Sequence, residues 1–136
     1  MLTHLAHAII YVLDQERAIE FYTTKLGLEV RTDITMDGMR WVTLGAHAQP
    51  DLEIALMEPV AGPFHDESTA QQMRELITKG AMGAGVWRTE DCARTHQEFL
   101  ERGVEFLSPP TERPYGVEAL FKDDSGNWFS LVQPRE

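Results

Sequence analysis

The chain contains a single cysteine, Cys92, among its 136 residues. One cysteine can form neither an intrachain disulfide nor a cysteine-based metal cluster. Basic residues are also scarce, because 12 Lys and Arg stand against 22 Asp and Glu, which gives a formal net charge of -10. An acidic surface repels phosphate backbones, so nucleic acid is not expected as a partner. The charge favours solubility and is compatible with attraction of a cationic ligand.

Long hydrophobic runs are absent as well. No apolar stretch approaches the roughly 20 residues that a membrane-spanning helix needs. The first residues lack the basic segment and the cleavage site of a signal peptide, so we expect a cytoplasmic protein that has no membrane partner. Hydrophobic residues nevertheless make up 43% of the chain, which favours one folded domain with a sizeable core over disorder.

The first thirty residues have the pattern of a strand, a helix and a second strand. The segment Leu5–Leu13 is rich in Ile, Val and Tyr and lacks Gly and Pro, which favours a strand. Asp14 is a good helix N-cap because its carboxylate can accept a free N–H of the first turn. Apolar residues then recur at helical spacing up to Leu26, and Gly27 suits the left-handed residue that ends a helix.

Two further strands complete the first half of the chain. Asp37 and Gly38 form a strong hairpin turn signal between the second strand and a third at Met39–Leu44. A fourth strand is expected at Asp51–Met57. The long segment that follows contains one helix-compatible stretch, Ser68–Lys79, and we interpret it as a connection that covers a pocket.

The second half repeats this order. A strand at Ala84–Thr89 precedes a helix capped by Asp91 or Glu90, and Gly103 follows Glu90 at the same distance of 13 residues that separates Gly27 from Asp14. A strand that begins at Val104 is expected to be interrupted by two prolines. The two prolines are Pro109 and Pro110. Two more strands are expected at Tyr115–Phe121 and Trp128–Val132, with a turn between them at Asp123–Asn127. Two copies of one β-α-β-β-β pattern therefore account for nearly the whole chain.

These patterns resemble the glyoxalase I, bleomycin-resistance and extradiol dioxygenase superfamily, whose fold is called vicinal oxygen chelate. The residues that carry the resemblance are His7–Asp14, Arg17–Tyr22, Leu26-Gly27, Arg102–Val104, Pro114–Gly116 and Asp123–Asn127. The resemblance implies an α+β fold in which two tandem modules form curved half-barrel sheets with a shared cleft. Within a single domain of residues 1–136 it implies module one at 1–59, a connector at 60–82 and module two at 83–136. It also implies a homodimer, which agrees with the open strand edges of each half-barrel.

Enzymes of that superfamily hold a divalent metal with residues from the first and last strand of each module. By position, the resemblance assigns these places to His7, Glu53, Ala84 (or Gly83) and Ser130. Alanine and glycine cannot bind a metal and a serine hydroxyl is a poor ligand, so only two protein ligands remain where a catalytic zinc site normally has three. No metal or other cofactor is therefore expected, although a divalent metal held by His7, Glu53 and a non-standard third ligand, for which His65 is the best candidate, stays an alternative.

Alternation along the strands predicts what else lines the cleft. The side chains on the face of His7 and Glu53 are predominantly apolar or aromatic, which suits a planar or hydrophobic small molecule, although some of them can equally be core. The predicted ligand-binding residues are His7, Ile9, Tyr11, Trp41, Glu53, Met57, Phe121 and Ser130. Tyr115 is added to them because Tyr115 and Gly116 resemble a segment that lies near the ligand in the superfamily. The pair His7 and Glu53 can orient a ligand or serve as a hydrogen-bonded structural pair.

Three functions follow from these observations. The first is a metal-independent protein of the bleomycin-resistance type, which sequesters an apolar or aromatic, possibly cationic, small molecule. The second is a lyase or dioxygenase that uses a metal held by His7 and Glu53. The third is an isomerase with Glu53 as general base. Ala84 and Ser130 favour the first, and the sequence identifies neither the ligand nor a catalytic residue.

Overall fold

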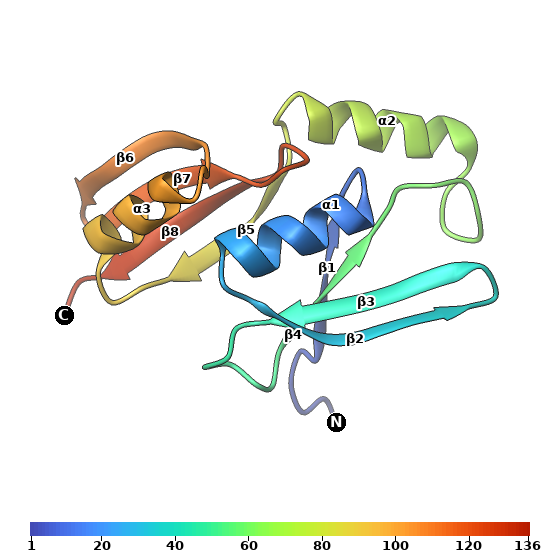
Figure 1. Cartoon of the computed structure of the whole chain (residues 1–136), viewed down its shortest axis with the longest axis horizontal. Coiled ribbons are helices and arrows are strands. Elements are labelled where there is room, and N and C mark those ends of the chain that lie inside the picture. The colour runs from blue at the N-terminus through green and yellow to red at the C-terminus, as the bar shows by residue number, and fades with distance from the viewer. The chain divides into compact units, whose positions relative to one another are not determined.

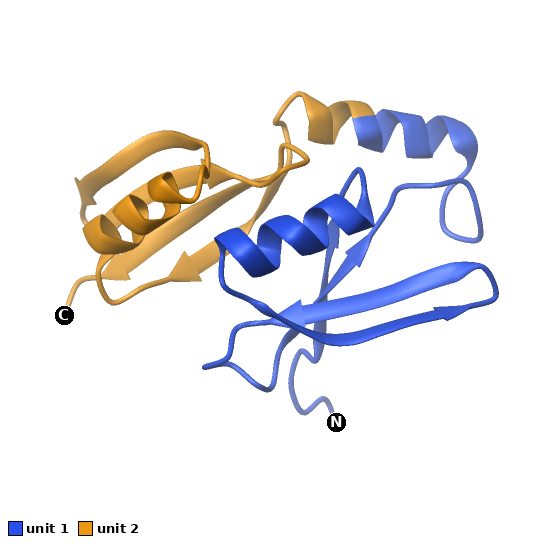
Figure 2. Cartoon of the chain, viewed as in Figure 1, with its two compact units in different colours: residues 1–74 blue, residues 75–136 orange.

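The computed structural model describes residues 1–136 and contains two compact units, residues 1–74 and residues 75–136 (Figure 2). Each unit is built around one four-stranded sheet whose two outer strands do not pair with each other, so neither sheet is a closed barrel. The helix α2, Glu67–Thr78, contains the boundary between the units (Figures 1 and 2). None of the helices combines the length and the apolar character needed to cross a bilayer.

The first unit begins with the strand β1, His7–Tyr11, and the helix α1, Gln15–Glu20, which continues as a π-helical turn over Phe21–Lys25. Asp14 caps α1, because its side chain accepts a hydrogen bond from the Arg17 N–H, as the sequence predicted. The strands β2, β3 and β4 follow, and the order across the sheet is β1-β4-β3-β2, with bounds of Glu29–Met36, Met39–Gly45 and Glu53–Met57. The predicted turn at Asp37 and Gly38 is confirmed, since both residues have positive φ.

The second unit repeats this topology, as Figure 1 shows. The strand β5, Gly83–Arg88, leads into the helix α3, Cys92–Glu101, which Asp91 caps through a hydrogen bond from the Arg94 N–H. The strands β6, β7 and β8 then form a sheet of order β5-β8-β7-β6, with bounds of Phe106–Arg113, Gly116–Lys122 and Trp128–Pro134. In both units the first and last strands are parallel neighbours and the other pairs are antiparallel. The α+β fold of two tandem β-α-β-β-β modules is therefore confirmed.

Each sheet has one face that its helix covers and one that it leaves open. In the first unit, alternation along the strands places on the helix side the fully or almost fully buried residues Ile10, Val42, Leu44, Ile54 and Leu56. In the second unit the rings of Phe99, on α3, and Phe121, on β7, pack edge to face at 5.6 Å. These contacts form the two cores. The side chains that point to the opposite side of each sheet make up the face that we call open.

The prolines Pro109 and Pro110 do not interrupt the strand in which they lie, which corrects the prediction. β6 runs through both of them, because it is an edge strand of the sheet and pairs only with β7. Proline lacks an N–H, and an edge strand tolerates that loss on its unpaired side. The pairing with β7 shifts register between Ser108 and Thr111, so the proline pair is accommodated as an irregularity.

Gly116 provides a test of this packing. Its φ is 145°, and a Cβ atom there would lie 2.1 Å from the Gln133 carbonyl oxygen of the neighbouring strand. Gly116→Ala is therefore expected to lower the free energy of unfolding by at least about 2 kcal/mol, since both the backbone conformation and the close approach are violated. Denaturant unfolding with Gly62→Ala as the control, where a Cβ meets nothing within 4 Å, checks this. Equal stability of the two variants would contradict it.

Candidate functional site

The open face of the first sheet carries one small polar cluster. β1 and β4 pair with His7 opposite Glu53, and the His7 Nε2 lies 3.8 Å from the Glu53 Oε1. The same Glu53 oxygen accepts a hydrogen bond of 2.6 Å from the Thr43 hydroxyl on the adjacent strand β3. The side chains of His7 and Glu53 remain 44% and 29% exposed, so they can reach a bound molecule. The predicted pairing of His7 with Glu53 is therefore present in the structure.

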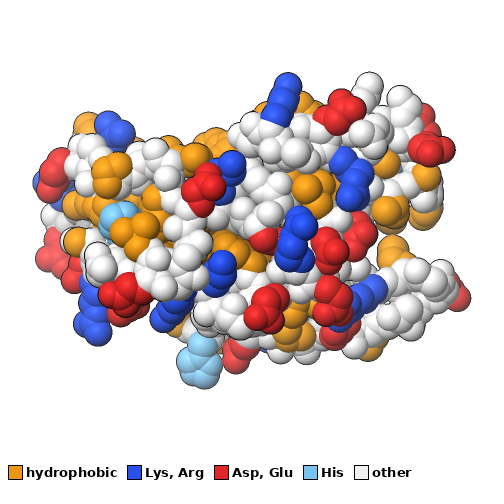
Figure 3. Space-filling model, turned by 45° about the horizontal axis from the view of Figure 1, so that its top comes forward, with side chains coloured by type: hydrophobic (Ala, Val, Ile, Leu, Met, Phe, Trp, Pro, Cys, Tyr) orange, Lys and Arg blue, Asp and Glu red, His pale blue; other side chains and the backbone are white.

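Large apolar side chains surround this cluster. The Trp41 ring lies edge-on to His7 at a centroid distance of 5.6 Å, and Ile9, next along β1 on this face, is 53% exposed. Tyr11 and Met57 are paired neighbours at the far end of β1 and β4, and Tyr11 contacts the His65 ring at 5.6 Å. The cluster thus combines exposed apolar groups with polar ones, which is typical of ligand-binding surfaces. Hydrophobic side chains also lie between acidic and basic ones on the face of the molecule drawn in Figure 3.

The open face of the second sheet is organised around a carboxylate, Glu118. The Glu118 Oε2 accepts a hydrogen bond of 2.5 Å from the Ser130 hydroxyl, and the Oε1 accepts one of 2.7 Å from the Tyr115 hydroxyl. The guanidinium of Arg113 lies 3.8 Å from the same carboxylate. The hydrogen bond from Ser130, followed by that from Tyr115, lowers the pKa of Glu118, and the hydrogen bond to Glu118 raises the pKa of the Tyr115 phenol. Two of the predicted ligand-binding residues, Tyr115 and Ser130, thus donate hydrogen bonds to the same residue, Glu118, which the prediction did not include.

Phe121 does not belong to an open face, which corrects the prediction. It is fully buried and packs against Phe99 of α3 and against Phe129. The difference is one residue of register. Arg113 pairs with Gly116, so Pro114 and Tyr115 form the turn and Gly116 takes the place that Met39 has in the first unit, one residue after the turn glycine Gly38. In a strand such a slip exchanges the two faces.

The same slip explains why Glu118 was missed. A two-residue turn signal at Pro114 and Tyr115 would have placed Glu118 on the open side of β7. Leu120, two residues after Glu118 and therefore on the same face of β7, pairs directly with Ser130. Because paired residues share a face, Glu118 and Ser130 lie on the same side of the sheet.

The position that corresponds to Glu53 in the second unit is Trp128 and not Ser130. Tyr11 and Arg88 are the last residues of β1 and β5, and they pair with Met57 and Val132. The residue four positions before Met57 is Glu53, and the residue four positions before Val132 is Trp128. Ser130 stays on the open face because the displacement is an even number of residues.

The residues at the four carried-over metal positions do not fit a divalent metal. His7 and Glu53 supply one imidazole and one carboxylate. In the second unit Gly83 pairs with Trp128 as His7 pairs with Glu53, and neither these two residues nor Ala84 supplies a ligand atom, while the Ser130 hydroxyl is a poor ligand. No group of three or more His, Cys, Asp or Glu side chains is arranged to hold an ion. His65, the candidate third ligand, contacts the ring of Tyr11. We therefore derive no chemical step through a metal.

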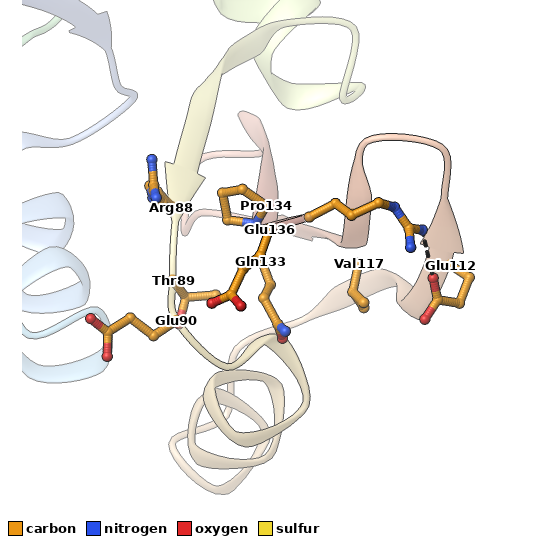
Figure 4. Close-up of a pocket in the computed structure, with 10 residues that line it drawn as sticks. Arg88, Thr89, Glu90, Glu112, Val117, Gln133, Pro134 and Glu136 are labelled. Atoms are coloured by element: carbon orange, nitrogen blue, oxygen red, sulfur yellow. Dashed lines mark hydrogen bonds and ion pairs between the residues drawn. The ribbon is translucent and has the colours of Figure 1, made fainter.

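Each unit also contains one larger hollow. The hollow of the first unit, about 400 Å³, lies beside Tyr11 and Met57 and the loop that follows β4. That of the second unit, about 830 Å³, is lined by charged and polar groups, with Gln133 and Val117 between Glu90 at one end and Glu112 at the other (Figure 4). Glu112 is paired there with Arg135 at 3.2 Å. The hollow of the first unit has the more apolar lining, and it alone includes predicted ligand-binding residues.

Comparison with known proteins gives these faces a context. Residues 4–131 match the sequence model of the Glyoxalase/Bleomycin resistance protein/Dioxygenase superfamily. The protein belongs to this superfamily. It is 32% identical to the uncharacterized protein YurT of Bacillus subtilis (strain 168), over 91% of this chain and 94% of that protein.

Two solved structures extend the comparison. UcmS2 has a TM-score of 0.92 and 45% identity, covering 98% of this chain and 99% of that one. TnmS3, described as an antibiotic binding protein from Streptomyces sp. CB03234, has a TM-score of 0.78 and 25% identity, covering 98% of both chains. Both structures thus share the fold of this chain over almost its full length.

The lowered pKa of Glu118 predicts a pH dependence of stability. A carboxyl whose pKa is depressed by folding contributes stability above its unfolded pKa of about 4.3, and this contribution is lost as the pH falls through the folded value. Carbon-13 NMR of the Glu118 carboxyl should give a midpoint below the ordinary glutamate range. Ser130→Ala and Tyr115→Phe should each raise it, because each removes one hydroxyl donor.

A Glu118 midpoint at the ordinary glutamate value of about 4.3, or one that does not change in either variant, would contradict the role of the two hydroxyls.

Proposed function

We propose that the protein binds an apolar, aromatic small molecule and sequesters it without a metal and without converting it. The observation that carries this proposal is the open face of the first sheet. There Ile9, Tyr11, Trp41 and Met57 surround a single polar cluster, and the helix of the unit covers the opposite face. Walls of this kind favour a ring system over a small polar metabolite, because apolar contact supplies most of the affinity.

The polar groups supply orientation. Glu53 is held by the Thr43 hydroxyl and lies beside His7, so donor and acceptor atoms project from a fixed position on the face. A ligand carbonyl or hydroxyl that forms hydrogen bonds with these groups holds the ligand in one orientation. In this way a few polar contacts give specificity in an apolar site. In the second unit, Glu118 with Tyr115 and Ser130 offers a second acceptor.

The comparisons support this function over an enzymatic one. TnmS3, described as an antibiotic binding protein, resembles this chain over 98% of both sequences. A metalloenzyme of the superfamily would need protein ligands that this chain does not supply at Gly83, Ala84 or Trp128. Sequestration needs only complementary walls, and it is compatible with the solitary imidazole and carboxylate of the first unit.

The proposal predicts an order of effects among three variants. Trp41→Ala and Tyr11→Ala should each weaken binding at least about tenfold, because each removes apolar contact worth about 1.5–3 kcal/mol. His7→Ala should weaken binding less, since it removes one half-exposed polar contact worth about 0.5–1.5 kcal/mol. Isothermal titration calorimetry with a panel of antibiotics that contain fused aromatic rings, together with a bleomycin, measures the three affinities.

Leu100→Ala is the matched control, because it truncates a partly exposed apolar residue on α3, a helix of the unit that does not carry this face. No binding of any panel member by the unsubstituted protein would contradict the proposed function. So would a loss on His7→Ala that exceeds the losses on Trp41→Ala and Tyr11→Ala.

A further inference from the structure

The hollow of the first unit extends the proposed binding face beyond β1 and β4. Tyr11 and Met57 belong to both, since they lie on the open face with His7 and Glu53 and also line this hollow. Met39, at the start of β3, and Phe64, in the loop after β4, add further apolar wall, and they are 46% and 69% exposed. A volume of about 400 Å³ is within the usual range of small-molecule sites, about 300–1,000 Å³.

The polar groups of this hollow include two acceptors with unused capacity. The Glu58 Oε2 accepts the Gln15 N–H at 3.0 Å, and the Gln15 Nε2 donates to the carbonyl oxygens of Arg40, at 3.1 Å, and Leu56, at 2.8 Å. These bonds fix both side chains. The Glu58 Oε1 and the Gln15 Oε1 remain as acceptors that no group of the chain occupies, and both residues line the hollow.

The one arginine of the lining is already engaged by carboxylates. The Arg40 Nε and Nη2 donate to the two Asp33 oxygens at 2.8 and 2.7 Å, and its Nη1 contacts Glu16. The hydrogen bond from Arg40 lowers the pKa of Asp33, so this pair stays ionised at neutral pH. The positive charge of Arg40 is therefore balanced by Asp33 and Glu16, while Glu58 and Asp37 leave the hollow electronegative.

We infer that this hollow takes a protonated amine attached to an apolar or aromatic ring, an inference that rests on the proposed function and names its ligand class. The ammonium group donates to Glu58 and Gln15, and the ring packs against Tyr11, Met39 and Met57. Charge-assisted hydrogen bonds of this kind are stronger than neutral ones. The net charge of -10 attracts cations to the protein and so favours the same ligand class.

The test uses two probes of equal shape, naphthylmethylamine and naphthylmethanol, which differ in charge at neutral pH. Carbon-13 methyl labelling of methionine reports the position of binding, because Met39 and Met57 line the hollow and Met82 lies in the other unit. The amine should shift the Met39 and Met57 signals saturably and leave Met82 unchanged. It should bind about tenfold more tightly than the alcohol, in line with the strength of hydrogen bonds to charged groups.

Glu58→Gln isolates the charge. The amide oxygen can still accept the Gln15 N–H, so the loop contact is kept while the negative charge is removed. This variant should lower amine affinity about tenfold and leave alcohol affinity unchanged. Glu20→Gln, which removes the same charge from the exposed side of α1, should change neither.

Equal binding of the two probes, amine binding that survives Glu58→Gln, or the absence of shifts at Met39 and Met57 would each overturn the inference. None of these results would decide the proposed function, which is judged by antibiotic binding and its dependence on Trp41. Conversely, a panel without any bound antibiotic, together with the predicted amine response, would overturn the proposed function and leave the amine site standing.

Discussion

The parallel pairing of the first and last strands in each unit determines which side chains can act together. It places His7 opposite Glu53 and Tyr11 opposite Met57, and the helix that follows the first strand covers the other face of the sheet. Because side chains alternate along a strand, this single register assigns every residue of β1 and β4 either to the core or to the open face. The binding face is thus a consequence of sheet topology and not of one local motif.

The two units use the same topology for different surfaces. In the first unit the open face combines aromatic and aliphatic side chains with one imidazole–carboxylate pair. In the second unit the paired positions that correspond to His7 and Glu53 hold Gly83 and Trp128, and a carboxylate that accepts hydrogen bonds from two hydroxyls lies on the adjacent strand. Because the second unit supplies no metal-ligating atom at these positions, the proposed function relies on contact area and not on chemistry at a shared metal.

The local signals of the chain were sufficient for the fold. Asp14 and Asp91 cap helices and the turn at Asp37 and Gly38 has positive φ at both residues, because each of these depends only on neighbouring backbone groups. The repeat of these signals predicted two modules with the same strand order. Pro109 and Pro110 were misjudged because a strand can contain proline at an edge, and the position of a strand within a sheet depends on long-range pairing.

The residues of the candidate site were predictable only on strands whose pairing register follows from the sequence. His7 and Glu53 were paired correctly, since they lie on adjacent strands with no irregularity between them. Phe121 was assigned to the wrong face and Glu118 was missed, because one residue of uncertainty at the turn before β7 reverses the alternation. The acceptors at Gln15 and Glu58 arise from side chains 43 positions apart, and no spacing rule brings them together.

The fate of the bound compound tests the central claim most directly. A panel antibiotic that binds is incubated with a stoichiometric amount of protein, with and without added zinc and with a chelator. Mass spectrometry then quantifies the compound after the protein is denatured. The account predicts full recovery at unchanged mass in all three conditions, with the bound fraction limited by the number of chains. Progressive loss of the compound beyond one equivalent per chain, or appearance of a product that depends on the metal, would contradict it.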